Sequence, residues 1–193
     1  MPHVLVIEAH PDAGRFSTAL ADAYADGAAR AGAQVTRLAL RDLRFDPILR
    51  GGFRGGQALE PDLLTARAAI EAADHLVWVT PVWWGSLPAL FKGFIDRAFL
   101  PGWAFENTGA ALPKGLLAGR TARVISSMDS PWWWYWLKHG RAAHRSLIGS
   151  TLNYVGIGKV SETTVYVLRK LDEGARKAWI ARAAADGARD AAG

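Results

Sequence analysis

The chain has 193 residues, half of which are hydrophobic, and carries a formal net charge of +5. It contains no cysteine, which excludes disulfides, thiolate catalysis and cysteine-ligated metal centres. Its first apolar run, residues 4–7, is too short for a secretory signal, and no segment approaches the length of a membrane span. We therefore expect a cytoplasmic protein without stable membrane insertion.

The length suits one compact domain over residues 1–193, long enough to bury a core without a metal or a disulfide. A basic chain favours anionic partners such as nucleotide phosphates, nucleic acid or a membrane surface. The basic residues are mixed with acidic ones along the predicted helices, however, so most of them are expected to form an ordinary solvated surface. We predict no nucleic-acid face and no metal site.

The first half of the chain alternates short apolar strands with helices. A β-branched apolar run predicts a buried strand at His3–Ala9, and apolar residues at helical spacing predict a helix from Phe16 to about Gly32. Gln34–Leu40 alternates as a half-buried strand does. Residues 42–56, rich in glycine and arginine, are expected to be irregular. A helix from Pro61 to about Ala73 begins with proline at its first position.

The second half continues the same alternation, and its first strand is the most apolar of all. In chain order the predicted elements are a strand at His75–Thr80, a helix at Pro88–Phe99, a strand at Thr121–Ser127, a helix at Arg141–Val155, a strand at Glu162–Leu168 and a helix at Leu171–Ala192.

Five strands that alternate with helices predict an α/β fold, with a parallel sheet covered by helices on both faces. Such three-layer sandwiches bind ligands outside the carboxyl ends of the strands, where the strand order reverses. In the order 2-1-3-4-5 this point lies beside the first and third strands. The loops expected to form a site are therefore His10–Ser17, Thr80–Leu87 and Ser126–His139.

The first of these loops has the features of a phosphate site. It carries a histidine, a glycine and two hydroxyls directly before a helix, whose first backbone N–H groups can bind an anion, with Ser17 or Thr18 as the helix cap. It lacks the G-K-[ST] ending of a Walker loop and the three glycines of a Rossmann fingerprint. An ordinary capped helix start is the alternative interpretation.

The other two loops hold six of the nine tryptophans: Trp83, Trp84 and four in the run Trp132–Trp136. A consecutive aromatic run fits neither helical nor strand periodicity, so one face of one element cannot bury it. Some of these rings are expected to meet a ligand or a partner subunit, although a hydrophobic cluster beneath the loop is an alternative. Aromatic loops beside a phosphate turn favour a flat ring with a phosphate tail. A flavin, a nicotinamide or an adenine nucleotide would fit.

The motifs in these loops resemble a known family. From Pro2 to about Tyr166 the chain resembles the flavodoxin-like NAD(P)H:quinone reductases of the DT-diaphorase type, together with related bacterial reductases and potassium-efflux ancillary proteins. The resemblance rests on Ala9-His10 with Phe16-Ser17, on the segment Pro81–Phe94, which retains the pattern P-x-x-W-x-x-x-P-A-x-x-K-G in full, and on Ser126-Ser127. It implies a flavodoxin-like fold.

The resemblance also implies site residues. The phosphate and ribityl end of a flavin would be held by His10, Arg15, Phe16 and Ser17, its ring would be bordered by Pro81, Val82, Trp83 and Trp84, and its pyrimidine side by Ser126 and Ser127. The family's catalytic histidine corresponds to His139, with His144 as its rival. The family's tyrosine falls on Trp133 or Trp134, so Tyr135 is the neighbouring candidate. Met128-Asp129 replaces a glycine pair of the family.

By resemblance, the chain would pass two electrons from NAD(P)H through flavin N5 to a quinone, nitroaromatic or azo acceptor in a ping-pong cycle. The first loop favours FAD, whereas the short chain, with no C-terminal extension to wrap an adenine, favours FMN. FAD is the prediction. A homodimer is expected. One alternative is a flavin-bound ancillary subunit of a transporter with little turnover, and another is a nucleic-acid binder that stacks bases on the tryptophan run.

Overall fold

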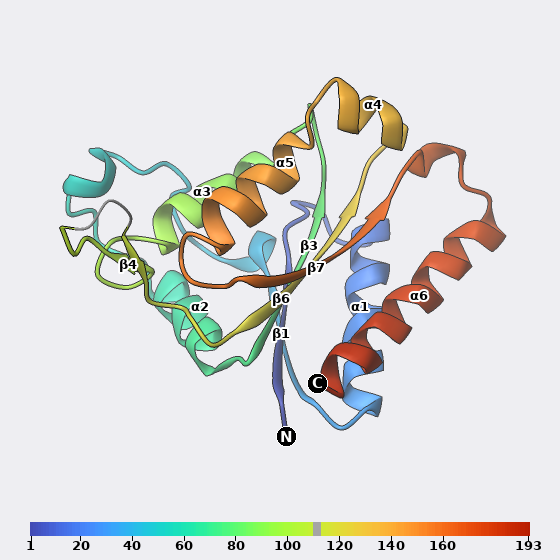
Figure 1. Ribbon diagram of the computed structural model, residues 1–193, viewed down its shortest axis with the longest axis horizontal. Helices are drawn as coiled ribbons and strands as arrows, with labels where there is room; N and C mark the ends of the chain where they lie inside the picture. Colours follow the sequence, from blue (N-terminus) through green and yellow to red (C-terminus); the bar gives the residue numbers. More distant parts are fainter. Residues whose placement is uncertain (110–112) are drawn as a thin grey trace.

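Five parallel strands form the centre of the molecule in the computed structural model, which describes residues 1–109 and 113–193. They are β1 (His3–Glu8), β2 (Gln34–Ala39), β3 (His75–Pro81), β6 (Thr121–Ser127) and β7 (Lys159–Val165). Their order is β2-β1-β3-β6-β7, so the predicted order 2-1-3-4-5 is confirmed (Figure 1).

The predicted boundaries of the last strand are wrong by three residues. The sequence pattern placed this strand at Glu162–Leu168, whereas β7 pairs with β6 from Lys159 to Val165. β7 is an edge strand, and its first four residues are largely exposed, so apolar periodicity does not mark its start. The strand ends before Val167, whose φ of 53° is left-handed.

Helices cover both faces of the sheet (Figure 1). α1 (Phe16–Arg30) and α6 (Glu173–Ala191) lie on one face. The other face carries α2 (Pro61–Ala72), α3 (Ala89–Ala98) and a continuous helical segment made of α5 (Ala142–His144) and the π-helical η3 (Arg145–Leu152). Two separate apolar clusters fill the spaces between sheet and helices, one on each face. The predicted three-layer sandwich is thus confirmed.

The remaining elements are short. They are the 3-10 turns η1 (Leu40–Asp42), η2 (Gly52–Arg54) and η4 (Leu168–Lys170), the antiparallel pair β4 (Phe105–Glu106) and β5 (Lys114–Gly115), and α4 (Trp132–Leu137). No helix within residues 1–109 and 113–193 is both long enough and apolar enough to cross a bilayer.

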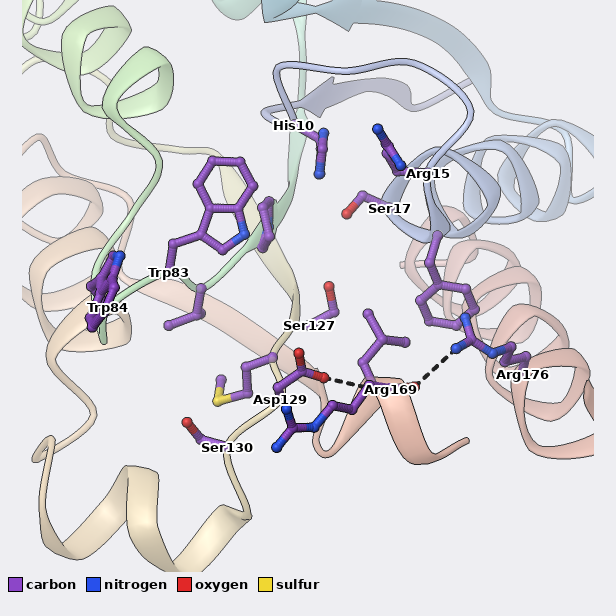
Figure 2. A pocket seen from close by; sticks show the side chains of 15 residues that line it. His10, Arg15, Ser17, Trp83, Trp84, Ser127, Asp129, Ser130, Arg169 and Arg176 are labelled. Atoms are coloured by element: carbon purple, nitrogen blue, oxygen red, sulfur yellow. Dashed lines mark hydrogen bonds between the residues drawn. The ribbon is translucent and has the colours of Figure 1, made fainter. Parts of the chain in front are cut away.

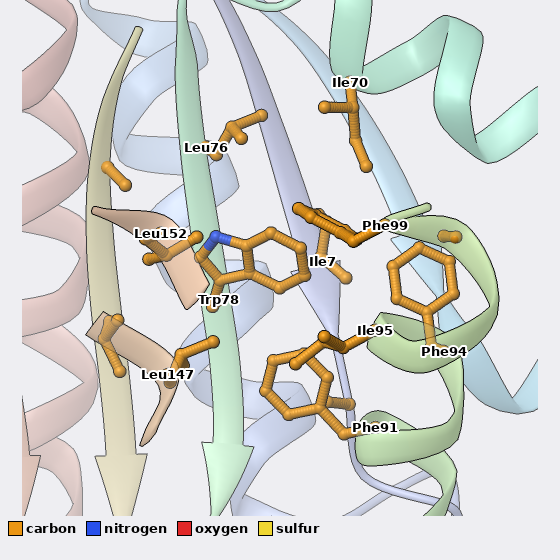
Figure 3. Packing of buried hydrophobic residues seen from close by; sticks show 14 of the residues in the cluster. Ile7, Ile70, Leu76, Trp78, Phe91, Phe94, Ile95, Phe99, Leu147 and Leu152 are labelled. Carbon is orange, nitrogen blue, oxygen red and sulfur yellow. The ribbon is translucent and has the colours of Figure 1, made fainter. Parts of the chain in front are cut away.

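The larger core is built around Trp78 of β3. This side chain is fully buried and stacks on Phe91 of α3, with ring centroids 5.4 Å apart and planes inclined by 19°. Phe94 and Phe99 pack against the same indole (Figure 3). All seven residues of β3 are buried, which agrees with its nearly continuous apolar sequence. The core therefore anchors the strand that leads into the second predicted loop.

On the opposite face, α6 is held close to α1 and to the sheet. A Cβ at Gly27 would collide with the backbone of Ala184, and one at Gly187 would collide with the backbone of Tyr24, so both glycines are needed for this helix crossing. This contact positions α6, which carries Arg176 to the carboxyl edge of the sheet.

A buried charge network holds the C-terminal end of α6 in place. Asp190 accepts hydrogen bonds from Arg123 of β6 (2.8 Å) and from the Tyr24 hydroxyl (2.7 Å), and it lies 3.4 Å from His75. Burial alone would raise the pKa of Asp190, but hydrogen bonds from Arg123, His75 and Tyr24 lower it below its usual value. The network thus favours the charged form of Asp190 and attaches the C-terminal end of α6 to the sheet.

Candidate functional site

A cavity of about 930 Å³ opens at the carboxyl edge of the sheet, where the strand order reverses between β1 and β3. Its size is that of a site for a nucleotide-sized ligand. Figure 2 shows its walls, which come from the loops after β1, β3, β6 and β7 and from α6. The lining residues are His10, Arg15, Phe16, Ser17, Pro81, Val82, Trp83, Trp84, Ser127, Met128, Asp129, Ser130, Leu168, Arg169 and Arg176.

The first wall is the start of α1. Its N-cap is Arg15, and no side chain caps the helix. The predicted caps are therefore wrong, because Thr18 donates to Glu8 at 2.5 Å, and Ser17 lies one residue inside the helix. Within residues 1–109 and 113–193, the amides of Phe16 and Ser17 have no hydrogen-bond acceptor. Free amides at a helix start that faces a cavity suit an anion such as a phosphate.

Cations surround this helix start. Arg15 is paired with Asp12 at 2.9 Å, and both side chains are more than half exposed. The guanidinium of Arg176, which comes from α6, lies 5.7 Å from the centre of the Phe16 ring. It donates to two backbone carbonyls and forms no ion pair within the described part of the chain. The positive potential here adds to that of the helix dipole.

The second wall is aromatic. Trp83 leaves 43% of its surface exposed and makes an edge contact with His10, at 5.4 Å between ring centroids. It begins a two-residue turn in which Trp83 and Ser86 exchange backbone hydrogen bonds of 3.0 and 2.9 Å. Trp84 and Gly85 both have positive φ, as in a type I′ turn. This turn leaves the Trp84 side chain fully exposed at the rim of the cavity.

The third wall joins the loop after β6 to the segment after β7. Met128 donates to the carbonyl of Val165 (2.9 Å) and accepts from Leu168 (3.0 Å), while Asp129 Oδ1 accepts from the amide of Arg169 (2.8 Å). Residues 128–129, which replace a glycine pair of the resembled family, are thus part of a cross-connection that closes this side of the cavity.

Most of the predicted cofactor residues meet in this cavity. Nine of the ten line it: His10, Arg15, Phe16, Ser17, Pro81, Val82, Trp83, Trp84 and Ser127. Ser126 does not line it, because alternation along β6 turns its side chain to the opposite face of the sheet, where its hydroxyl lies 3.1 Å from His144 Nε2.

Six lining residues are not among the predicted cofactor residues. Met128, Asp129 and Ser130 lie in the third predicted loop, whereas Leu168, Arg169 and Arg176 lie outside the three predicted loops. The loop after the fifth strand opens at the same sheet edge as the others, which is the signal that was available. Placing the end of that strand at Leu168 concealed it, because the predicted strand absorbed the segment that turns into the cavity.

The predicted catalytic pair lies outside the cavity walls. Tyr135 is buried, and its hydroxyl lies 2.8 Å from Nδ1 of His144, while the centre of its ring lies 6.3 Å from that of the His139 ring. His139 accepts a hydrogen bond from the Trp134 indole (3.1 Å) and packs behind the Trp84–Gly85 turn, where a Cβ on Gly85 would lie 2.7 Å from its Nδ1. Catalytic roles for Tyr135 and His139 remain predictions.

His144, the predicted rival of His139, is the centre of a buried polar cluster. Besides Tyr135 it approaches Ser126 (3.1 Å) and Thr164 (3.2 Å) through Nε2. Burial lowers the pKa of His144, and nearby Arg141 lowers it further, whereas Glu162 opposes the shift. Burial also raises the pKa of Tyr135. Both groups are therefore held neutral at pH 7.

The tryptophan run forms α4, which the sequence pattern placed in a loop. Only Tyr135 of this helix points into the protein, whereas Trp132, Trp133, Trp134 and Trp136 are between 41% and 62% exposed. Of the six loop tryptophans, some of which were expected to meet a ligand or a partner subunit, Trp83 and Trp84 line the cavity. The four of α4 do not line it within this chain, because the single inward position of this short helix is filled by Tyr135.

Comparisons with known proteins agree with the fold. A family model described as "Flavodoxin-like fold" matches residues 2–188. A Haemophilus influenzae protein named "Uncharacterized NAD(P)H oxidoreductase" is 29% identical over 188 residues, covering 93% of this chain and 91% of the relative.

Two solved structures are also similar. An NAD(P)H:quinone oxidoreductase from Methanothermobacter marburgensis has a TM-score of 0.81 and 25% identity, covering 97% of this chain and 96% of the other. An FMN-dependent NADH-azoreductase from Bacillus anthracis in complex with FMN has a TM-score of 0.75 and 19% identity, covering 98% of each chain, so it shows a shared fold alone.

Proposed function

The chain belongs to the flavodoxin-like-fold family, and on that premise we propose that it is a flavin-dependent NAD(P)H oxidoreductase that reduces quinone or azo acceptors. The observation that carries the proposal is the convergence of two features in one cavity. The uncapped start of α1 offers free amides beside two arginines, and Trp83 offers an aromatic face on a neighbouring wall. A phosphate tail and a flat ring on one ligand would satisfy both.

We propose FMN as the flavin. The expected preference for FAD is not supported, whereas a solved protein of the same fold is in complex with FMN. The cavity offers one uncapped helix start, which matches the single phosphate of FMN. The residues that would hold this phosphate are Ser17 and Arg176, together with the amides of Phe16 and Ser17.

When bound, the flavin would supply the redox chemistry by accepting a hydride and passing two electrons on. The residues of the chain would orient the ring and manage charge. Trp83 and Val82 would flank the ring, and Ser127 would contact its polar edge. The amides of Asp129 and Ser130 have no acceptor within the described residues, and they would stabilise negative charge that develops at that edge.

We further propose that two copies of the chain associate through α4. Four exposed tryptophans in one turn and a half of helix are an uncommon surface for a free protein, and they follow directly on the loop that forms the third wall. Size-exclusion chromatography with light scattering tests this point. A monomer at micromolar concentration would reject it without affecting the proposed chemistry.

The deciding experiment begins with the absorbance spectrum of the purified protein. We expect flavin bands, release of FMN on heating, and oxidation of NADH or NADPH that depends on an added quinone. Initial rates at several concentrations of both substrates should give the parallel double-reciprocal lines of a ping-pong cycle. A protein that binds neither FMN nor FAD would refute the proposal. Flavin retention without turnover would instead favour the ancillary transport subunit.

A further inference from the structure

Arg169 places a guanidinium on the cavity wall opposite the start of α1. In Figure 2 it lies beside Asp129 and Ser130, across the cavity from His10 and Arg15. Its side chain is exposed at the rim and forms no ion pair within residues 1–109 and 113–193. Arg15, by contrast, is already paired with Asp12. The third wall thus presents a positive charge with no internal partner.

Among the described residues that line the cavity, Asp129 is the one carboxylate, and it does not neutralise this charge. Asp129 directs Oδ1 to the backbone amide of Arg169 at 2.8 Å, and no ion pair joins the two side chains. The carboxylate therefore holds the backbone of Arg169 in place and leaves the guanidinium available.

The backbone around Arg169 is held in a strained conformation. Val167 has φ 53° and ψ 40°, a left-handed conformation that is strained for a β-branched residue. Three hydrogen bonds hold the segment that follows it: Leu168 to the Met128 carbonyl (3.0 Å), Arg169 to Asp129 (2.8 Å) and Arg176 to the Leu168 carbonyl (3.1 Å). Strain that persists next to a cavity is typical of functional segments, and here it turns Leu168 and Arg169 inward.

FMN has one phosphate, and the start of α1 with Arg176 accounts for it. Arg169 lies on another wall and has no part in that arrangement. We propose that Arg169 is a second anion subsite, which binds an oxyanion on the molecule that docks against the flavin. This inference rests on the proposed function. The oxyanion is the 2′-phosphate if that molecule is NADPH, or a sulfonate or carboxylate if it is an acidic acceptor, and the same guanidinium chemistry would recognise either.

The test uses the flavin-loaded protein and two matched pairs of probes. The first pair is NADP⁺ and NAD⁺, whose dissociation constants are measured by titration calorimetry. The second pair is 1,4-naphthoquinone-2-sulfonate and 1,4-naphthoquinone, compared by kcat/KM. In each pair the first probe, here called the anionic probe, carries one oxyanion that the second lacks. The ratio between the two probes cancels general effects on stability or flavin content. Arg169→Gln removes the charge, and Lys170→Gln removes an equal charge one residue away, outside the cavity.

We expect Arg169→Gln to lower the preference for the anionic probe about ten-fold in one of the two pairs, the size of one charge-assisted hydrogen bond. The affected pair identifies the source of the oxyanion. Lys170→Gln should leave both ratios unchanged, and Arg169→Gln should retain flavin. Unchanged ratios in both pairs would overturn the second subsite while leaving the proposed function intact. Loss of flavin from Arg169→Gln would also overturn it, because Arg169 would then belong to the flavin site.

Two variants of Asp129 separate position from charge. Asp129→Asn removes the negative charge but keeps an oxygen that accepts from the Arg169 amide, so affinity for the anionic probe should stay equal or rise. Asp129→Ala removes the acceptor as well, so that affinity should fall towards the value of Arg169→Gln. If Asp129→Ala binds the anionic probe as well as Asp129→Asn does, the positioning role of Asp129 is refuted.

Discussion

Replacing Trp83 by alanine is the most direct test of how the cavity holds a flat ring. Trp83 has 43% of its surface exposed, and a tryptophan side chain offers up to about 250 Å². About 110 Å² is therefore available for a ligand to cover, worth about 2.7 kcal/mol at 25 cal/mol/Å². A ring that stacks on one face would cover about half of that area. We expect Trp83→Ala to raise the dissociation constant for FMN between about ten-fold and a hundred-fold.

The assay is titration of the apoprotein with FMN, followed by flavin fluorescence. Trp83→Phe keeps a smaller aromatic face and should fall between wild type and Trp83→Ala. Trp103→Ala is the matched control, because this tryptophan lies outside the cavity and bonds Glu71. It should lower the melting temperature without changing FMN affinity. If Trp83→Ala binds FMN as tightly as wild type while its melting temperature is unchanged, the aromatic wall does not hold the flavin.

Three further predictions concern the framework of the site. Asp190→Asn should lower the free energy of unfolding by about 3 kcal/mol at pH 7 in urea titrations. Since the folded pKa of Asp190 is depressed, the stabilisation that its carboxylate provides is present above about pH 4 and is lost as the pH falls below it. The free energy of unfolding of the variant should therefore decrease less steeply on acidification than that of wild type. Equal slopes would contradict this. Gly187→Ala should cost about 1–3 kcal/mol, because the new methyl group meets the Tyr24 carbonyl, and a neutral effect would show that the helices can separate freely. Tyr135→Phe should cost about 1–3 kcal/mol by removing a partner of buried His144, whereas unchanged stability would argue against that hydrogen bond.

The architecture and most of the cavity could be predicted from the sequence because local patterns encode them. The apolar run of β3 and the alternation of strands with helices predict a parallel sheet, and a parallel sheet places its ligand site at one edge. The segment Pro81–Phe94 is a contiguous motif. The pairs Ala9-His10 and Phe16-Ser17 are equally local. These short motifs therefore predict the lining residues of the loops after β1 and β3, from His10 to Trp84.

Only the tertiary structure decided which side chains complete the site. β7 is an edge strand whose first residues are exposed, so its register comes from pairing with β6 and not from its own pattern. That register turns Leu168 and Arg169 into the cavity. Alternation along β6 likewise separates Ser126 from Ser127. Tyr135 pairs with His144 rather than His139 because α4 has one inward position, and which residue fills it depends on packing against the sheet.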